Sequence, residues 1–213
     1  ISFLFLSTIS NNNFFNFTGR SFMIENISVK TDNSNLDHLL NSRLKSFYKK
    51  NIFLINKSTI LSKLDDLNFI ENIKVKIKYP STLIVNANKT NFIAITYIDQ
   101  KKYYVGNNKK FILAKSINYE KKLPLIFGQF RIENFLSLKK KLSDQGLEQN
   151  KIKKYYFHKN KRWDLYIEKN ILLMLPNKNI TEAIKLYKEF LIKNLIKSDT
   201  IVDLRINGRI ILK

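Results

Sequence analysis

The sequence contains no cysteine, and this absence removes several classes of site at once. Without thiols there can be no disulfide framework, no thiolate zinc site and no cysteine nucleophile. Glycine is also scarce, with five residues in 213, so there is little material for the glycine-rich loops that cradle phosphates. The stretch G-N-N-K-K at 106–110 lacks the second glycine and the Lys-Ser/Thr pair of such a loop.

Histidine and paired carboxylates are nearly absent too. The two histidines, His38 and His158, lie far apart in the sequence, and neither belongs to an H-x-x-H or H-x-E pattern that would suggest a metal site. Asp65 and Asp66 are adjacent, and adjacent side chains on a helix point about 100° apart, so they cannot bracket one bond. We therefore predict that the protein is not an enzyme and that it has no cofactor and no metal site.

No apolar run reaches the roughly 20 residues that a membrane helix requires. The longest candidate, I-S-F-L-F-L-S-T-I-S at 1–10, ends at three asparagines and would cross about half of a bilayer core. It could be the end of a membrane helix, the remnant of a signal peptide or a buried core segment. The polar residues that follow it favour the first two interpretations.

Positive charge is abundant, with 38 Lys+Arg against 17 Asp+Glu and a formal net charge of +21. Only six of these residues are arginine, the better side chain for bidentate phosphate and base recognition. Two stretches, 101–111 and 151–163, mix lysine with aromatic residues and would suit single-stranded nucleic acid if Tyr103, Tyr155 and Trp163 were exposed together. The same pattern fits strands that place aromatic residues in a core, and we favour this interpretation.

The first part of the chain predicts a small α+β domain. A short strand is expected at 23–30, an amphipathic helix at 35–49 capped by Asp32 or Ser34, and a second helix opened by Ser58 and Thr59. Two alternating runs at 70–79 and 82–89 flank a Pro-Ser turn and indicate a hairpin. The order strand, helix, helix, strand, strand implies a three-stranded sheet with two helices on one face.

The remainder is mostly strand. We expect a β domain with helices at about 133–144 and 181–197 and a final pair of strands turned at Asn207-Gly208. The second helix is expected to pack through Ile184, Leu186, Tyr187, Phe190, Leu191 and Leu195. The boundary between the two parts falls near 89–93, without a flexible linker.

Several motifs, taken in order, resemble the bacterial cell-division family FtsQ/DivIB. In the run at 69–94, Pro80, Thr82, Leu83, Val85 and Ala94 match the family pattern, whereas Lys89-Thr90 and Asn91-Phe92 depart from it. Further matches are N-I-F-L-I-N at 51–56, L-P-L-I-F-G at 123–128 and V-D-L-R at 202–205 followed by Gly208. Together they cover about residues 20–213.

The resemblance implies a single-pass inner-membrane protein whose periplasmic part is enriched at the division septum. Residues 1–10 would be the end of a truncated transmembrane helix, 20–90 a polypeptide-transport-associated (POTRA) domain of order β-α-α-β-β, and 91–213 a mostly antiparallel β domain with two helices. The implied function is that of a non-enzymatic divisome scaffold, which links early and late division proteins and regulates septal peptidoglycan synthesis. The alternatives are another POTRA-type module of the envelope and a basic module that binds single-stranded nucleic acid.

The resemblance also implies where partners bind. Members of the family bind FtsB and FtsL by adding a strand at the C-terminal edge, and an arginine after V-D-L pairs with an acidic residue of FtsB. In this sequence Arg205 holds that position. The expected partner-binding residues are Arg205, Ile206, Arg209, Ile210, Ile211 and Leu212, and other division proteins are expected to bind the POTRA domain. The chain departs from the family at Ile206, where tyrosine is frequent, and near Lys213, where tryptophan is frequent.

Overall fold

A computed structural model describes residues 22–117, 119 and 121–213. The chain divides into two compact units, Ile1–Thr90 and Asn91–Lys213, each with its own hydrophobic core. The expected membrane segment at 1–10 lies outside the described residues. Within the described part of the chain, no helix has the length and apolar character needed to cross a bilayer.

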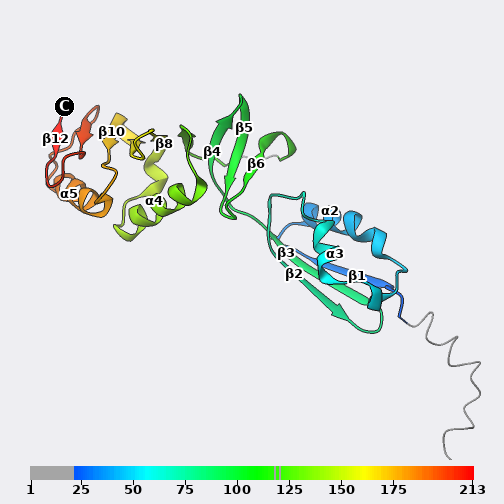
Figure 1. The fold of residues 1–213 in the computed structure, drawn as a ribbon. Helices are drawn as coiled ribbons and strands as arrows, with labels where there is room; N and C mark the ends of the chain where they lie inside the picture. Colours follow the sequence, from blue (N-terminus) through cyan, green and yellow to red (C-terminus); the bar gives the residue numbers. More distant parts are fainter. Residues whose placement is uncertain (1–21, 118, 120) are drawn as a thin grey trace, which may run out of the picture. The chain divides into compact units, whose positions relative to one another are not determined.

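The first unit is a three-stranded sheet with two helices, in the expected order along the chain (Figure 1). Strand β3 lies in the middle of the sheet, parallel to β1 and antiparallel to β2. The elements are β1 (Asn26–Lys30), α2 (Ser34–Leu44), η1 (Lys45–Phe47), η2 (Ile52–Leu54), α3 (Lys57–Ser62), β2 (Ile70–Lys78) and β3 (Thr82–Lys89).

Each α-helix of the first unit is capped by the asparagine that precedes it. The side chain of Asn33 accepts hydrogen bonds from the backbone N–H groups two and three residues later, and Asn56 caps α3 in the same way. The cap of the first helix was predicted at Asp32 or Ser34, which is wrong by one residue. The second helix was predicted to open at Ser58, which is one residue after its first residue and two after its cap. Asn, Asp and Ser cap helices about equally well, so composition alone cannot choose among neighbours.

The two helices cover one face of this sheet and build its core. Val75 and Ile77 of β2 lie opposite Val85 and Leu83 of β3, which are fully buried. The core residues shared by the helices and the sheet include Leu36, Leu40, Leu44, Ile60, Leu64, Leu83, Val85 and Ala87. The alternate residues of β2, Lys74, Lys76 and Lys78, are exposed, as the period of two along a strand requires.

The second unit is built on a nine-stranded sheet, in the order β12-β11-β10-β9-β8-β7-β4-β5-β6. Its strands are β4 (Phe92–Ile98), β5 (Lys101–Gly106), β6 (Phe111–Leu113), β7 (Leu125–Phe127), β8 (Ile152–Phe157), β9 (Trp163–Ile167), β10 (Ile171–Met174), β11 (Ile201–Asp203) and β12 (Ile211–Leu212). Its α-helices are α4 (Ile132–Asp144) and α5 (Ile180–Ile192), and the short helices are η3 (Ala114–Ser116), η4 (Gln149–Lys151) and η5 (Glu168–Asn170).

Three of the strand pairs in this sheet are parallel: β4 with β7, β7 with β8, and β10 with β11. The other five pairs of the described strands are antiparallel, so the sheet is mostly antiparallel, as expected, with three parallel pairs that the sequence did not indicate. Helix α4 connects β7 to β8 and α5 connects β10 to β11. Such a crossover is what parallel neighbours need, because a tight turn can join only antiparallel strands.

Helix α5 is shorter than the sequence predicts. It ends at Ile192 because Asn194 adopts a left-handed conformation (φ 56°), and the N–H of Leu195 donates to the carbonyl of Phe190 at 3.0 Å, which closes the helix end. Leu195 is consequently 50% exposed, so its predicted place on the packed side of the helix is wrong. Ile184 and Tyr187, by contrast, are buried as expected.

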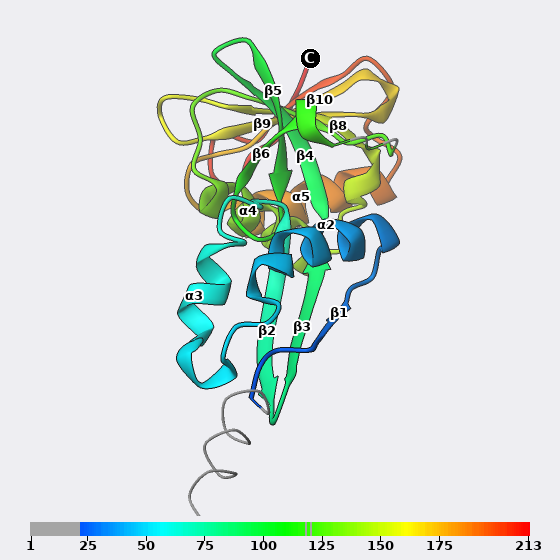
Figure 2. The same ribbon diagram turned by 90° about the vertical axis from the view of Figure 1, so that its right-hand side faces the viewer.

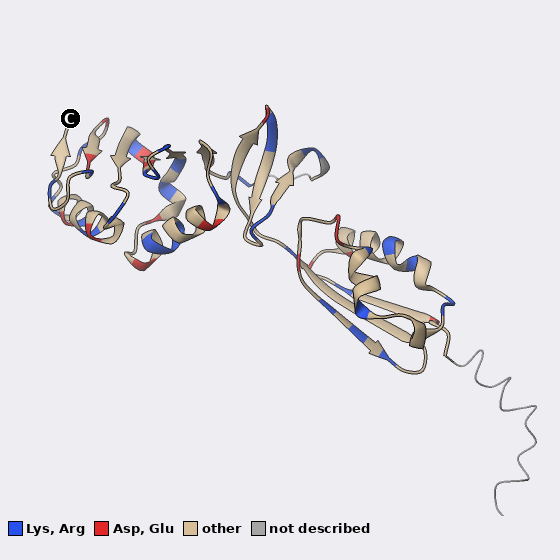
Figure 3. Cartoon of the chain, in the orientation of Figure 1, with Lys and Arg blue, Asp and Glu red and all other residues tan. Residues whose placement is uncertain are grey.

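Two of the three aromatic residues on which a nucleic-acid surface would depend are buried in the second unit, whereas Tyr103 is half-buried. Tyr155 and Trp163 are 0% and 3% exposed, and the ring of Phe135 meets that of Tyr155 edge-on with centroids 5.0 Å apart. A platform for stacking bases would need Tyr155 and Trp163 at the surface. Their burial rules out the stacking platform that the nucleic-acid alternative proposed. The lysines and arginines, meanwhile, are spread over both units (Figure 3).

Candidate partner-binding edge

The last two strands form an antiparallel pair at one end of the nine-stranded sheet. Val202 lies opposite Leu212 and Asp203 opposite Ile211, and the pair turns through Asn207 and Gly208, as the sequence predicts. Gly208 has φ +70° with open space around it, which suits a tight turn. Figure 1 shows β12 at the C-terminal end of the chain.

Strand β12 has an unused backbone edge. Ile201 and Lys213 exchange two hydrogen bonds, at 2.9 and 3.0 Å. Because such pairs alternate along an antiparallel ladder, the backbone of Leu212 points away from β11. Among residues 22–117, 119 and 121–213, no strand pairs with the outer side of β12. The N–H and C=O groups of Leu212 are therefore placed to pair with an added strand.

Apolar side chains accompany this edge. Ile206, Ile211 and Leu212 are 51%, 39% and 38% exposed, whereas Ile210 is half-buried and packs against the core of the second unit. Ile211 and Leu212 point to opposite faces of the sheet because successive strand residues alternate. Three of the four apolar residues predicted to contact a partner are thus accessible. The fourth, Ile210, is partly buried in the core of the second unit.

Arg205 follows β11, the strand next to β12, and is held by Asp203 of that strand. Its Nε and Nη2 donate to the two carboxylate oxygens at 2.8 and 2.5 Å, and its backbone N–H donates to Oδ1 at 3.1 Å. These hydrogen bonds lower the pKa of the Asp203 carboxyl, which is nearly buried. The Arg205 side chain remains 45% exposed, and its guanidinium has further N–H groups that can donate to a partner.

Arg209 lies just after the turn and is exposed. Among the described residues it has no ion-pair partner; its backbone N–H donates to the carbonyl of Ile206 at 3.1 Å. With Ile206 it borders a hollow of about 280 Å³ between α5 and the β11–β12 turn. The hollow is lined further by Pro176, Glu182, Ala183, Leu186, Leu204, Asn207 and Gly208. The hollow can accept an apolar side chain of a partner, and a negative charge of the partner nearby could meet Arg209.

A second charged group lies close to Arg205 and was not identified from the sequence. Asp164 of β9 is 5% exposed; its Oδ2 lies 2.6 Å from His158 Nε2, and its Oδ1 accepts from Arg162 Nη1 at 2.8 Å. Asp164 and Asp203 both lie opposite Met174, one on each side. Arg162 and Arg205 share a hollow of about 200 Å³ with Asn160, Pro176 and Asn177. His158 is thus a partner of a buried carboxylate and not an isolated surface residue.

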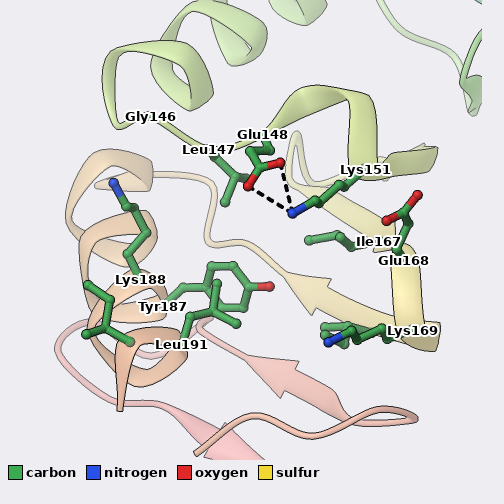
Figure 4. A pocket seen from close by; sticks show the side chains of 12 residues that line it. Gly146, Leu147, Glu148, Lys151, Ile167, Glu168, Lys169, Tyr187, Lys188 and Leu191 are labelled. Atoms are coloured by element: carbon green, nitrogen blue, oxygen red, sulfur yellow. Dashed lines mark hydrogen bonds and ion pairs between the residues drawn. The ribbon is translucent and has the colours of Figure 1, made fainter. Parts of the chain in front are cut away.

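A larger cavity of about 330 Å³ opens elsewhere in the second unit, between the loop after α4, strands β9 and β10, and α5 (Figure 4). Tyr187 points into it, and the ion pair of Lys151 with Glu148 lies on its rim at 2.8 Å. Burial raises the pKa of Tyr187 to about 12, so the phenol stays protonated. None of the described residues form a group of His, Cys, Asp or Glu that could hold a metal ion.

Comparisons with known proteins agree on one family. Residues 94–205, more than half of the chain, match the model of the family "Cell division protein FtsQ/DivIB, C-terminal". Two proteins named cell division protein FtsQ, from Rhizobium radiobacter and Agrobacterium fabrum strain C58, are each 24% identical over 149 residues, or 69% of this chain. The matched stretch spans 71% of the first relative and 47% of the second.

One similar solved structure is the major extracytoplasmic domain of the trans isomer of DivIB from Geobacillus stearothermophilus. It shares 11% sequence identity with this chain at a TM-score of 0.34, and the match covers 51% of this chain and 98% of that one.

Proposed function

Because this chain belongs to the FtsQ/DivIB family of cell-division proteins, we propose that it is a non-enzymatic scaffold that joins division proteins by strand addition. We assign residues 91–213 as the FtsQ-type β domain that binds FtsB and FtsL. In the same proposal, 20–90 is a POTRA domain that binds other division proteins. Residues 1–10 are the end of an inner-membrane helix that leaves both domains in the periplasm. The proposed role is regulation of septal peptidoglycan synthesis.

The observation that carries this proposal is the unused outer edge of β12, together with the partly exposed Arg205 that follows the neighbouring strand β11. An extended partner segment would pair with the backbone of Leu212, and its side chains would meet Ile206, Ile211 and Leu212. An acidic residue of the partner would meet Arg205, and the hollow beside Arg209 would take an apolar anchor. The shape of the first unit supports its assignment as a POTRA domain, since it has the β-α-α-β-β order and a sheet covered on one face.

The charge of Arg205 gives the first test. Binding of the C-terminal segment of FtsB to the purified chain should weaken by about 1–3 kcal/mol in Arg205→Glu, because a charge-assisted pair is lost. The measurement is fluorescence anisotropy of a labelled FtsB segment. Unchanged affinity would remove Arg205 from the site.

Two controls separate binding from folding. Arg205→Glu also leaves the buried Asp203 without its partner, so urea unfolding must show that the variant is folded at the assay temperature. Arg131→Glu makes the same charge change at an 81% exposed side chain, five strands away from β12 in the sheet order at the β7–α4 connection. It should leave the affinity unchanged apart from a small, salt-dependent shift.

A further inference from the structure

One end of the first unit carries aromatic side chains that the fold leaves exposed. Phe53 and Tyr79 are 58% and 55% exposed, and their rings stack with centroids 5.0 Å apart. Phe22 packs against Phe53 at 4.8 Å, and the neighbouring Leu54 is 84% exposed. We call these four residues, Phe22, Phe53, Leu54 and Tyr79, the aromatic tip.

Three separate segments meet at the aromatic tip. The N–H of Ile52 donates to the carbonyl of Phe22 at 2.8 Å, which joins η2 to the residues before β1. The N–H of Glu25 donates to the carbonyl of Ser81 at 2.9 Å, which joins the β2–β3 turn to the same place. Figure 2 shows this turn at the end of the unit where β1 begins. The tip is thus a fixed part of the fold.

The residues around the tip are basic. Lys49 and Lys50 precede η2, Lys57 follows it, and Lys78 precedes Tyr79; all four are exposed. Glu25 is the nearby acidic residue. An exposed aromatic and leucine cluster bordered by lysines has the composition of a surface that enters the headgroup region of an anionic bilayer. Tyrosine suits this region because its ring is apolar and its hydroxyl stays hydrated.

The position of the tip in the chain favours the same occupant. Eleven residues, 11–21, lie between the apolar run 1–10 and Phe22, and eleven extended residues span at most about 40 Å. If residues 1–10 are the end of a membrane helix, as proposed above, the tip is tethered within reach of the bilayer surface. We propose that the aromatic tip binds the surface of an anionic lipid bilayer and holds the first unit against it.

The absence of cysteine makes a direct test possible. In the full 213-residue chain, Leu54→Cys would carry the only thiol, labelled with an environment-sensitive fluorophore. The chain is reconstituted in vesicles of phosphatidylglycerol and phosphatidylcholine. We expect a blue shift of the label emission and quenching by spin-labelled lipid, both weaker in pure phosphatidylcholine. The matched control is Ile192→Cys in the second unit, also strongly exposed at 77%, where neither change should occur.

Flotation of the same samples separates the two proposals. If the chain floats with the vesicles but the label at position 54 shows no shift and no quenching, the tip proposal is wrong and the membrane anchor stands. If the chain does not float and the label is unaffected, the tip proposal is wrong, whereas the anchor proposal still stands because residues 1–10 cover only about half of a bilayer core. A signal at position 54 that requires an added division protein would likewise overturn the tip proposal, because the tip would then be a protein contact.

The basic border can be tested with the same label. Each lysine near an anionic surface contributes about a five-fold preference for the bound state. Lys78→Gln should therefore lower the ratio of quenched to unquenched label about five-fold at low salt. Lys30→Gln, at the other end of β1 from Phe22, should leave the ratio unchanged. Equal effects of the two variants would contradict a specific contact at the tip.

Discussion

At the residue scale, Arg205 serves the fold and the proposed partner at once. Two N–H groups of its guanidinium hold the Asp203 carboxylate, and the Arg205 side chain is still 45% exposed. An acidic partner residue would meet an arginine that is already fixed in position. A preorganised side chain loses less conformational entropy on binding than a mobile one, which favours this position for recognition.

The pairing of Asp203 predicts a pH dependence of stability. Its pKa is lowered in the folded state, chiefly by the hydrogen bonds from Arg205. A carboxyl with a depressed pKa stabilises the fold above its unfolded value of about 3.9, and this contribution is lost as the pH falls through the lower, folded value. In urea unfolding, wild type should be more stable than Asp203→Asn at pH 7, and the gap should shrink below about pH 4. A gap that stays constant down to pH 2 would contradict the assignment.

Tyr155 offers a change that should stabilise the protein. Its ring is fully buried, burial raises the pKa of its phenol, and the hydroxyl makes no hydrogen bond to any described residue. Removing an unpaired buried hydroxyl recovers its desolvation cost, so Tyr155→Phe should raise the free energy of unfolding by about 1 kcal/mol. Tyr156→Phe, on the half-buried neighbour, should change it little. A loss of stability in Tyr155→Phe would show that a buried water satisfies the hydroxyl.

The candidate site could be predicted from the sequence only in part. The V-D-L-R stretch and the Asn207-Gly208 turn placed Arg205, Ile211 and Leu212 at one edge of the second unit. The cluster of Asp164, His158 and Arg162 was missed, although Asp164 interrupts an otherwise apolar strand, W-D-L-Y-I. A buried aspartate inside such a strand needs a charged partner. The sequence alone could not show which basic residue would supply it.

At the element scale, the positions of the strands in the sequence were easier to predict than the neighbour with which each strand pairs in the sheet. Alternation and turn residues indicated the hairpin of β2 with β3 and the pair β11 with β12. The direction of pairing between β10 and β11, or between β7 and β8, depends on the helix that crosses between them. Periodicity describes one strand at a time, so it carries no information on such non-local pairing. The end of α5 at Asn194 was missed because asparagine is compatible with both a helix and its left-handed end.

Gly128, the residue directly after β7, lies against Phe157 at the end of β8, and this contact yields a prediction. Its φ is +98°, and a Cβ there would collide with the carbonyl of Phe157. Gly128→Ala should therefore destabilise the second unit by roughly 3 kcal/mol or more, through backbone strain and steric clash. Gly208→Ala has a similar positive φ but open space around it, and should lose only about 1 kcal/mol. Thermal unfolding of the two variants compares backbone strain alone, in Gly208→Ala, with strain plus a steric clash, in Gly128→Ala. Equal losses of stability would contradict the close contact of Gly128 with Phe157.

At the scale of the whole molecule, the two units have different proposed partners. The second unit presents the β12 edge, and the first presents the aromatic tip. The net charge of +21 is spread over both units, and Tyr155 and Trp163, two of the aromatic residues that could have stacked bases, are buried. In the two proposals, the distributed charge attracts anionic surfaces in general, and specificity would rest on the backbone edge and on a few side chains.

The central claim is that a partner strand pairs with the outer side of β12, and amide hydrogen exchange at single residues tests it most directly. Ile211 directs its N–H toward β11 and Leu212 directs its N–H outward. On addition of the FtsB C-terminal segment, the exchange of the Leu212 amide should slow strongly, while that of Ile211 should change much less. If the segment binds and the Leu212 amide exchanges as fast as before, strand addition at this edge is contradicted.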